Sequence, residues 1–562
     1  MSNKRRLLII GLDGATWDII APLAARGRLP AFSHLMKNGT GAPLYSTLPP
    51  ATFPAWTTFF TGKNPGKHGI FDFTEKVPGT YRVRFVNASF RKVESFWQLL
   101  SSAGLRVGVM GVPATYPPED INGFMISGFD SPVARSIDSS FVSPRGLYRD
   151  IKQHCGGYAI SDVLENVMDA GWYEDAAEKI SSGLAKRAET ALYLYRKEPW
   201  DCFTAVFGET DTASHHFWKF YDSGSPRYMP HAVLSAVIPG VYQQLDTVIG
   251  RFLDNLWEDT TVVIVSDHGF GGIGTKAISL NRWLADEGFL DIQEQASFAD
   301  RTLQRFKTAG LACLPHQVQE KVFRTVLKNV AQRMESRSRF SGIVWNRTIA
   351  FSEDMNYFPS IHINLKGREP AGIVEPGNDY EAARDQIIEK ITAWQDPVSG
   401  RPIVRCAWKR EDLFSGDYVY LAPDIILDLQ TDNGYSYLCL PYRNFTDTGP
   451  FTALSNEQLS GARLLSMSGS HRQEGVALFS GDMLEDCLLQ KPSIQDICPT
   501  ILSFFGFSVP EDMDGRVLPL FKSGQSGLNE NRSRYKAAKS IPYTAGQEKI
   551  VEERLRRLGY FD

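Results

Sequence analysis

The sequence predicts an α/β protein in which a mostly parallel sheet is flanked by helices. Short apolar runs recur along the chain with helical patterns between them, at residues 7–12, 106–110, 203–207, 261–265, 424–427 and 476–479. Strands without a polar side are typical of a parallel sheet that is covered by helices on both faces. Ligands of such sheets bind at the carboxyl ends of the strands, so polar residues directly after these runs are the first candidates for a functional site.

The chain of 562 residues is longer than a single hydrophobic core usually supports, so we expect one large core with inserted segments. Core segments are predicted at residues 1–129, 196–285 and 346–520, the last with a smaller insertion. Helical insertions that form a cap are predicted at 130–195 and 286–345, and a linker with a C-terminal helix at 521–562. In that helix Val551, Leu555 and Leu558 share one face and Gly559 ends it, so we expect it to dock on the core.

The insertion at 286–345 contains a basic segment. Residues 301–340 include nine Lys or Arg and two Glu, and Val322, Val326 and Val330 recur at helical spacing. The plainer interpretation is a cap helix with a solvated outer face. The alternative is a surface that contacts an anionic membrane peripherally or steers an anionic substrate.

Composition limits the class of protein. The formal net charge of −4 argues against a protein that binds a nucleic-acid polymer. The seven cysteines are scattered without a C-x-x-C pair, which favours a reducing, cytoplasmic compartment. We see no signal peptide, and no apolar stretch approaches the roughly 20 residues that cross a bilayer. The oligomeric state cannot be read from the sequence.

Four segments place Asp or His after a predicted strand or in the following turn, and together they supply three Asp and three His. Taken alone, each is as easily a helix cap or a turn former. As a set at one edge of one sheet, they offer the mixture of imidazole and carboxylate that a pair of zinc-like cations binds. The six residues are Asp13, Asp211, His215, Asp267, His268 and His471.

The nucleophile is suggested by a family resemblance. The resemblance is carried by two neighbouring stretches, Pro49-Pro-Ala-Thr52-Phe-Pro and Thr61-Gly-Lys-Asn-Pro-Gly-Lys-His68-Gly-Ile. Together they resemble the nucleophile segment of the alkaline phosphatase superfamily, in its type I phosphodiesterase/nucleotide pyrophosphatase branch. This branch includes bacterial phosphohydrolase and phosphomutase-like relatives. The segments around Asp496 and Asp514 also resemble the C-terminal part of the superfamily's sequences. The resemblance spans residues 7 to about 520 and implies an alkaline-phosphatase-like core.

The resemblance also implies roles for single residues. Thr52 would be the catalytic nucleophile, and two divalent metal ions would be bound, most simply Zn²⁺, with Mn²⁺ or Fe as other choices. Asp211, His215 and His471 would hold one ion, while Asp13, Thr52, Asp267 and His268 would hold the other.

These roles imply a hydrolase that cleaves a phosphodiester or pyrophosphate bond through a covalent Thr52 intermediate. The substrate would be a phosphate-ester small molecule or a lipid-linked phosphate. One alternative is a phosphomonoesterase or a phosphomutase-like phosphotransferase, which would need a basic group for the additional charge. A remote alternative is an inactive regulator that binds a phospho-ligand or a membrane surface.

One position departs from the family pattern. Where the branch has an Asn that contacts a phosphate oxygen, this chain has Phe73, so the substrate-binding pocket must differ. Arg472, His216 and, less favoured, Lys63 are the candidates to replace that contact. For Arg472 the alternative is a structural ion pair, and for His216 it is a packed neighbour of the metal ligand.

Three further residues lie close in sequence to the predicted site residues. His68 is predicted to support the loop behind the nucleophile. Trp56 and Trp218 could stack on a substrate, although buried core aromatics are more common. There is no G-x-x-x-x-G-K-[ST] phosphate loop, and Thr52-Phe-Pro-Ala-Trp56 lacks the C/S-x-P-x-R pattern of a sulfatase.

Overall fold

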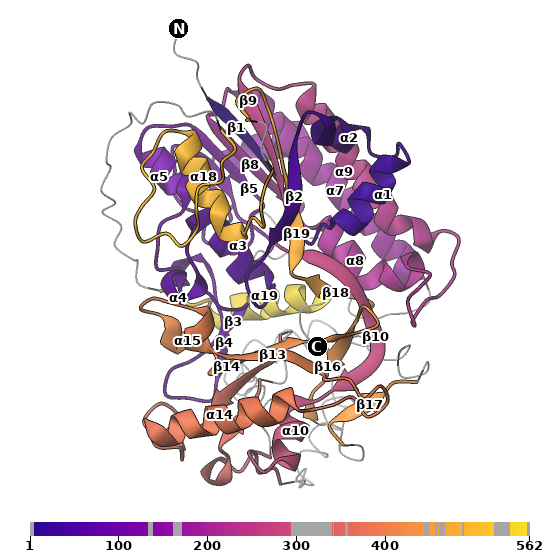
Figure 1. Ribbon diagram of the computed structural model, residues 1–562. Helices are drawn as coiled ribbons and strands as arrows, with labels where there is room; N and C mark the ends of the chain where they lie inside the picture. Colours follow the sequence, from indigo (N-terminus) through magenta and orange to yellow (C-terminus); the bar gives the residue numbers. More distant parts are fainter. Residues whose placement is uncertain are drawn as a thin grey trace, which may run out of the picture.

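The structure is a computed structural model with a large upper part built on one sheet and a smaller lower part built on two (Figure 1). It describes residues 5–132, 139–160, 171–293, 340, 342–353, 358–442, 449–455, 459, 467–485, 488–521 and 540–558.

The central sheet has eight strands in the order β2-β19-β9-β1-β8-β5-β6-β7. The neighbouring strands from β9 to β6 are all parallel. The predicted α/β fold with a mostly parallel sheet is therefore confirmed. The strands are β1 (Arg6–Leu12), β2 (Gly39–Tyr45), β5 (Val107–Met110), β6 (Gly123–Ile126), β7 (Val142–Ser143), β8 (Cys202–Phe207), β9 (Thr260–Val265) and β19 (Glu474–Ser480).

Two of the predicted strands differ from the expectation of a buried parallel sheet. The run at 424–427 lies mostly in β14 (Ile425–Leu429), which belongs to a separate antiparallel sheet. The run at 476–479 lies in β19, which is in the central sheet but antiparallel to both β2 and β9. Burial explains both errors, because a strand packed on both faces is equally apolar whichever way it runs and whichever sheet it joins.

Helices cover both faces of the central sheet, as the apolar strands require (Figure 1). One face packs against α1 (Trp17–Ala25), α2 (Pro30–Lys37), α7 (Trp172–Lys197), α8 (Glu209–Tyr221) and α9 (Val237–Leu253). The other packs against α3 (Thr52–Thr61), α5 (Phe96–Ser102) and α18 (Ile497–Phe504). The short helices α6 (Leu147–Cys155) and α4 (Pro65–His68) and the hairpin of β3 (Thr74–Lys76) and β4 (Val83–Phe85) complete this part.

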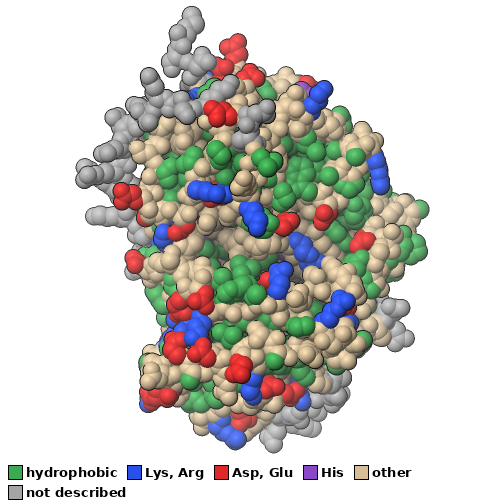
Figure 2. Space-filling model, in the orientation of Figure 1, with side chains coloured by type: hydrophobic (Ala, Val, Ile, Leu, Met, Phe, Trp, Pro, Cys, Tyr) green, Lys and Arg blue, Asp and Glu red, His purple; other side chains and the backbone are tan. Residues whose placement is uncertain are grey.

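The smaller part holds two further sheets. One has the order β15-β16-β10-β17, with β18 paired to β10, and the other has the order β11-β12-β14-β13. These strands are β10 (Gly269–Ile278), β11 (Ala350–Phe351), β12 (Ser360–Ile363), β13 (Val404–Lys409), β15 (Thr431–Asp432), β16 (Tyr435–Cys439), β17 (Phe451–Ala453) and β18 (Gly469–Arg472). Helices α10 (Leu280–Asp286), α14 (Asn378–Thr392) and α15 (Arg410–Leu413) pack here. Acidic and basic side chains are interspersed on the face in Figure 2, which is hollowed near its middle.

Several predicted segments fall on residues that the structure does not describe. The valine-bearing helix at 322–330 and the rest of 301–339 lie outside the described residues, as do 133–138, 161–170, 522–539 and Gly559. Peripheral membrane contact through 301–340 therefore stays a prediction. Among the described helices, none combines the length and apolar character needed to span a bilayer.

The C-terminal helix α19 (Ala545–Leu558) packs on the large part of the molecule. Val551, Leu555 and Leu558 are buried in the same apolar cluster as α7, α8 and α9. Polar contacts hold the segment at both ends, because the Arg554 guanidinium donates to the Phe129 carbonyl and the Tyr543 hydroxyl donates to the Asp130 carbonyl. The tail is thus tied to the loop after β6.

Leu555→Ala should lower the free energy of unfolding by about 2–4 kcal/mol, because a buried leucine loses its packing and leaves a cavity. Urea unfolding followed by circular dichroism would measure the change. Ile541→Ala, at a residue of the same tail that is 68% exposed, is the matched control and should shift stability by less than about 0.5 kcal/mol. Equal effects of the two substitutions would show that docking of α19 contributes little.

Candidate metal centre

The carboxyl ends of three adjacent parallel strands deliver the acidic side chains of the site. Asp13 directly follows β1, Asp267 and His268 follow β9, and Asp211 lies in the first turn of α8 after β8. Since β9, β1 and β8 are neighbours in the sheet, these residues converge at one edge. All four are at least 98% buried. The sequence argument from strand ends therefore located these side chains correctly in the fold.

Thr52 is the first residue of α3 and is fully buried. Its hydroxyl Oγ1 lies 3.3 Å from Nε2 of His268. The same Nε2 is 3.5 Å from Asp13 Oδ1 and 3.3 Å from Asp267 Oδ2. The structure thus brings together the hydroxyl, two carboxylates and an imidazole that the family resemblance assigns to one metal ion.

The second set meets on the other side of His268. Asp211 Oδ1 lies 3.4 Å from His215 Nε2 and 3.1 Å from His471 Nε2, and these two nitrogens are 3.1 Å apart. The rings of His268 and His471 are stacked with their centroids 3.6 Å apart. The two sets are therefore adjacent rather than separate sites.

The geometry allows two groups of ligand atoms, each within a span of 4.8 Å. One consists of Asp13, Asp267 and His268, and the other of Asp211, His268 and His471. His268 belongs to both groups, whereas the resemblance places it in the first set only and places His215 in the second. His215 nevertheless contacts both Asp211 and His471, so all six residues form one cluster.

Each imidazole is oriented by a backbone carbonyl. The Nδ1 atoms of His215, His268 and His471 lie 3.1, 3.1 and 2.9 Å from the carbonyl oxygens of Gly469, Gly269 and Pro50. An Nδ1–H that donates to a carbonyl leaves the lone pair on Nε2, which is the atom that faces the cluster. The ring tautomers are thus set for metal ligation.

Electrostatics also fit a bound cation. Burial raises the pKa of Asp13 and of Asp267 well above the usual range, and nearby carboxylates add to the effect. Burial lowers the pKa of His268 and of His471, which favours the neutral form of imidazole that binds a metal. Among the described residues, Asp13 Oδ1 and Asp267 Oδ2 are buried without a hydrogen-bond donor. Buried oxygens of this kind and neutral imidazoles match the donors that a zinc-like dication prefers.

Asp211 behaves differently from the other two carboxylates. Burial alone would raise its pKa, but His215 and His471 hold the pKa well below its usual range. Asp211 therefore remains ionised, which suits a residue that bridges two imidazoles at a metal site.

Trp56 makes a contact with the cluster that the sequence did not predict, since it was considered there only for stacking on a substrate or as a core aromatic. Its indole Nε1 donates to Asp13 Oδ2 over 3.0 Å, and both side chains are buried. Gly11 makes room for the ring, since a Cβ at that position would lie 2.5 Å from the Trp56 side chain. Trp56 lies four residues after Thr52 on α3, a spacing that places it on the same helix face. That spacing was the available clue.

Arg472 lies beside His471 but directs its guanidinium to protein oxygens. It donates to the Ser436 hydroxyl and to the carbonyls of Gly272 and Gly434. These bonds join β18, β10 and the turn before β16. They favour a structural role over the predicted contact with phosphate.

The other predicted substrate contacts lie in apolar or distant surroundings. His216 is buried against Trp172, with ring centroids 5.2 Å apart. Phe73 is buried against Phe53 and Phe129, with centroids at 4.4 and 6.5 Å. His216 is thus the packed neighbour of the metal ligand, while Phe73 lies beside the residue that follows the nucleophile.

Lys63 lies two residues beyond the far end of α3, a helix of 10 residues that is about 15 Å long and begins at Thr52. There it forms an ion pair with Asp512. His68 is buried behind the nucleophile helix, where its Nε2 lies 3.1 Å from Thr58 Oγ1 and its Nδ1 accepts from the Ile70 N–H. Of the two, only His68 has the surroundings that the sequence predicted for it.

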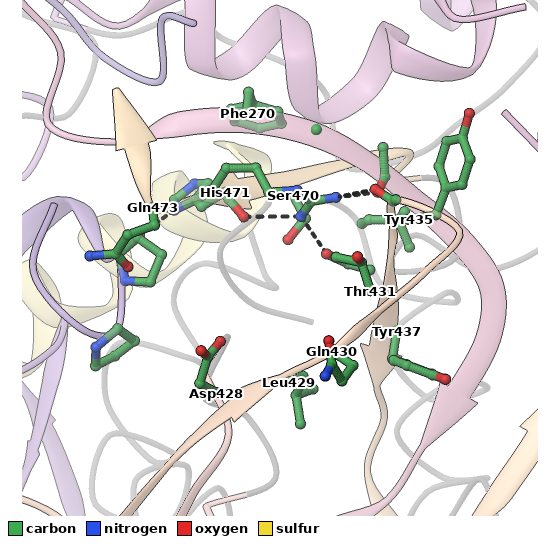
Figure 3. Close-up of a pocket in the computed structure, with 18 of the residues that line it drawn as sticks. Phe270, Asp428, Leu429, Gln430, Thr431, Tyr435, Tyr437, Ser470, His471 and Gln473 are labelled. Carbon is green, nitrogen blue, oxygen red and sulfur yellow. Dashed lines mark hydrogen bonds between the residues drawn. The ribbon is translucent and has the colours of Figure 1, made fainter. Parts of the chain in front are cut away.

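A cavity of about 670 Å³ opens beside the cluster, with His471 in its wall. Figure 3 shows His471, Ser470 and Gln473 on one side of it and Asp428 to Thr431 across from them. Trp218 also lines this cavity, while its indole N–H donates to Asp222. An organic group could therefore reach the cluster from the smaller part of the molecule.

Comparison with protein families gives one match. Residues 7–438 match the family described as type I phosphodiesterase/nucleotide pyrophosphatase, which covers most of the chain. No curated protein sequence matches this chain.

Solved structures with a similar fold include phosphonoacetate hydrolase from Sinorhizobium meliloti in complex with phosphonoacetate. It is 15% identical, with 90% of this chain and 95% of that chain covered and a TM-score of 0.51. Murine ectonucleotide pyrophosphatase/phosphodiesterase 5, as an inactive variant with AMP, is 14% identical, with coverages of 90% and 96% and a TM-score of 0.44. The human protein has 14% identity, coverages of 91% and 97% and a TM-score of 0.44.

Trp56→Phe should weaken metal binding about 10- to 100-fold, because it removes the N–H that orients Asp13 while keeping an aromatic ring. Competition with a fluorescent zinc chelator would measure the dissociation constant. Trp97→Phe, at a buried indole whose N–H donates to Glu119 away from the cluster, is the matched control. A dissociation constant for Trp56→Phe within twofold of the wild-type value would show that the bond does not orient the ligand.

Proposed function

This chain belongs to the type I phosphodiesterase/nucleotide pyrophosphatase family, and we propose that it cleaves a phosphodiester or pyrophosphate bond through a covalent intermediate on Thr52. Membership confirms the predicted branch of the alkaline phosphatase superfamily and makes the chain a metal-dependent hydrolase of phosphate esters. The nucleophile, the number of metal ions and the bond that is cleaved belong to the proposal.

The observation that carries the proposal is the position of the Thr52 hydroxyl. Oγ1 is buried at the N-terminal end of α3, 3.3 Å from a His268 nitrogen that also faces Asp13 and Asp267. A threonine hydroxyl is a weak nucleophile unless its proton is removed or its charge is stabilised. The Thr52 hydroxyl lies directly against a nitrogen of the cluster of potential metal ligands.

The reaction then follows in two steps. Thr52 Oγ1 loses its proton to solvent and attacks phosphorus, a new P–O bond forms, and the bond to the leaving oxygen breaks with its electron pair, which takes up a proton. A water molecule then loses a proton and attacks the same phosphorus, the P–O bond to Thr52 breaks, and the Thr52 oxygen takes up a proton as the phosphate product is released. The helix N-terminus places backbone N–H groups and a partial positive charge near the non-bridging oxygens.

Two divalent cations, most simply Zn²⁺, would stabilise the entering and the leaving oxygen when bound. Asp13, Thr52, Asp267 and His268 would hold one and Asp211, His215 and His471 the other. The buried carboxylates and the Nε2 lone pairs support this assignment, since they supply the donor types of such a centre.

Cleavage of a diester is favoured over cleavage of a monoester. A monoester carries an additional negative charge, and the two basic residues considered for it are engaged elsewhere. Arg472 donates to a hydroxyl and backbone carbonyls, and Lys63 pairs with Asp512. The phosphomonoesterase and phosphomutase-like alternatives therefore have weaker support. An inactive regulator would be expected to have lost part of the cluster, which here is complete.

Thr52→Ala should lower kcat/KM for bis(4-nitrophenyl) phosphate at least 10³-fold, while Thr80→Ala, at a hydroxyl bonded to the Val77 carbonyl, should leave it within twofold. Release of 4-nitrophenolate measures the rate, with 4-nitrophenyl phosphate as the monoester for comparison. Mass spectrometry of acid-quenched wild-type protein should find a phosphate ester on the Thr52 peptide. Full activity of Thr52→Ala would remove Thr52 from the mechanism.

Removal of metal with a chelator should abolish hydrolysis, and readdition should restore it with two ions per chain, because the buried cluster offers two groups of ligands. Titration of the apoprotein with Zn²⁺, Mn²⁺ or Fe²⁺, followed by activity and by metal analysis, would identify the ion. Metal-free protein that keeps full activity would contradict the metal-dependent mechanism.

A further inference from the structure

The cavity beside His471 lies where the leaving group of the proposed reaction would depart. Thr52 contacts His268 on one side, and His471 stacks on the His268 ring. In an in-line displacement the nucleophile and the leaving oxygen lie on opposite sides of phosphorus. With Thr52 at the first set of ligands, the leaving oxygen lies toward the second set, and His471 of that set is in the cavity wall.

The size of the cavity indicates that it holds an organic group. Its volume of about 670 Å³ falls in the range of small-molecule sites and exceeds what a phosphate group alone requires. The large part of the molecule contributes Trp17 and Trp218 to the wall, and the smaller part contributes Phe270, Phe358 and Tyr435. The wall is therefore rich in aromatic rings.

Two of these rings are fixed by one carboxylate. The Trp218 indole N–H and the Tyr435 hydroxyl donate to Asp222 Oδ2 over 3.2 and 3.0 Å. Burial and the Asp222 carboxylate raise the pKa of Tyr435 to about 12, so its hydroxyl remains a donor at neutral pH. Gly272 admits both rings, since a Cβ there would lie 2.7 Å from Tyr435 and 2.9 Å from Trp218. The positions of the Trp218 and Tyr435 rings in the cavity wall are therefore fixed before any ligand binds.

The charges of the wall disfavour an anionic occupant. Arg405 pairs with Asp428, Nε to Oδ2 over 2.6 Å, and Arg472 is engaged by a hydroxyl and two carbonyls. Among the described residues, no lysine lines the cavity, whereas carboxylates are contributed by Asp18, Asp222, Asp428 and Glu474. A leaving group with a further negative charge would face these four carboxylates, which outnumber the two guanidinium groups of the wall, Arg405 and Arg472.

We propose that this cavity binds the leaving group of the diester and selects a polar alcohol that is neutral or cationic over one that carries a negative charge. The proposal rests on the proposed function and names the substrate class. Hydroxyl or amine groups of such an alcohol would meet the carboxylates and side-chain amides of the wall, and its carbon skeleton would meet the aromatic rings. Oligophosphate leaving groups, such as pyrophosphate, are thereby disfavoured.

The experiment compares three diesters that share a glycerol phosphate half: glycerophosphoglycerol, glycerophosphoethanolamine and glycerophosphoglycerate. Their second groups are neutral, cationic and anionic. With metal-loaded wild-type protein, the first two should each have a kcat/KM at least tenfold above that of the third, by chromatographic analysis of the products. A kcat/KM for glycerophosphoglycerate equal to or above the others would overturn the proposal.

Asp428→Asn tests the source of the selectivity. This substitution leaves Arg405 without its carboxylate partner, so the preference for the neutral over the anionic diester should fall at least fivefold. Asp291→Asn, which breaks the comparable pair with Arg347 outside the cavity, is the matched control and should leave the preference unchanged. An unchanged preference in Asp428→Asn would contradict the charge argument.

Calorimetry with metal-loaded Thr52→Ala protein separates this proposal from the proposed function, because it measures binding without turnover. Tighter binding of glycerophosphoglycerol than of glycerophosphoglycerate supports the cavity assignment. The same order of binding with no hydrolysis by wild-type protein would overturn the proposed function alone. Binding of the anionic diester at least as tightly would overturn the cavity assignment alone.

Discussion

The carboxylates of Asp13, Asp211 and Asp267 are buried together at the carboxyl edge of the sheet, and the residues around them are arranged to compensate their charge. Desolvation opposes the ionisation of all three, and charge repulsion adds to it at Asp13 and Asp267, whereas His215 and His471 keep Asp211 ionised. Such a cluster is stable only if cations or protons compensate it. The surrounding structure favours cations, because backbone carbonyls turn the Nε2 atoms of the three histidines toward the carboxylates and Trp56 holds Asp13.

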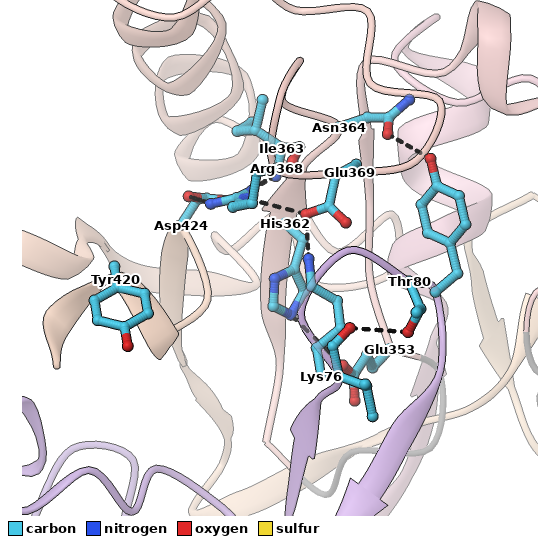
Figure 4. Close-up of polar contacts among 12 residues, drawn as sticks. Lys76, Thr80, Glu353, His362, Ile363, Asn364, Arg368, Glu369, Tyr420 and Asp424 are labelled. Carbon is cyan, nitrogen blue, oxygen red and sulfur yellow. Dashed lines mark hydrogen bonds and ion pairs between the residues drawn. The ribbon is translucent and has the colours of Figure 1, made fainter.

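The cluster of carboxylates and histidines also connects the two parts of the molecule. β10 begins directly after His268 at the central sheet and continues into the smaller part, where it pairs with β18, which carries His471. Arg472 reinforces this junction by bonds to the Gly272 and Gly434 carbonyls. Two ion pairs add to this junction (Figure 4): Lys76 of β3 pairs with Glu369 of the smaller part, and the neighbouring Arg368 pairs with Asp424 within the smaller part. The metal centre and the cavity wall therefore depend on one continuous framework.

Much of this could be predicted from the sequence, because buried parallel strands and the polar residues at their ends are local patterns. Asp13, Asp267 and His268 were found in this way. The bond of Trp56 to Asp13 was not predicted, because it joins two elements and an indole on a buried helix looks the same in the sequence whether or not its N–H is used. The role of Arg472 depends on carbonyls about 40 and 200 residues away, which no local pattern reveals. The strand at 424–427 was assigned to the wrong sheet because apolar character reports burial and not the partner strand.

The helix that carries Thr52 lacks a side chain that would stabilise its N-terminus. Its N-cap is Ala51, which provides no side-chain hydrogen bond, although Ser, Thr, Asp or Asn there would stabilise a helix by about 1 kcal/mol. A capping side chain would occupy the backbone N–H groups that a phosphate oxygen can use. Phe73, which by the family resemblance stands where an Asn would contact phosphate, packs on Phe53 and offers no side-chain donor. Because Arg472 and Lys63 are engaged elsewhere, the proposed mechanism assigns the neutralisation of the phosphate to bound metal ions and to the uncapped N–H groups at the start of α3.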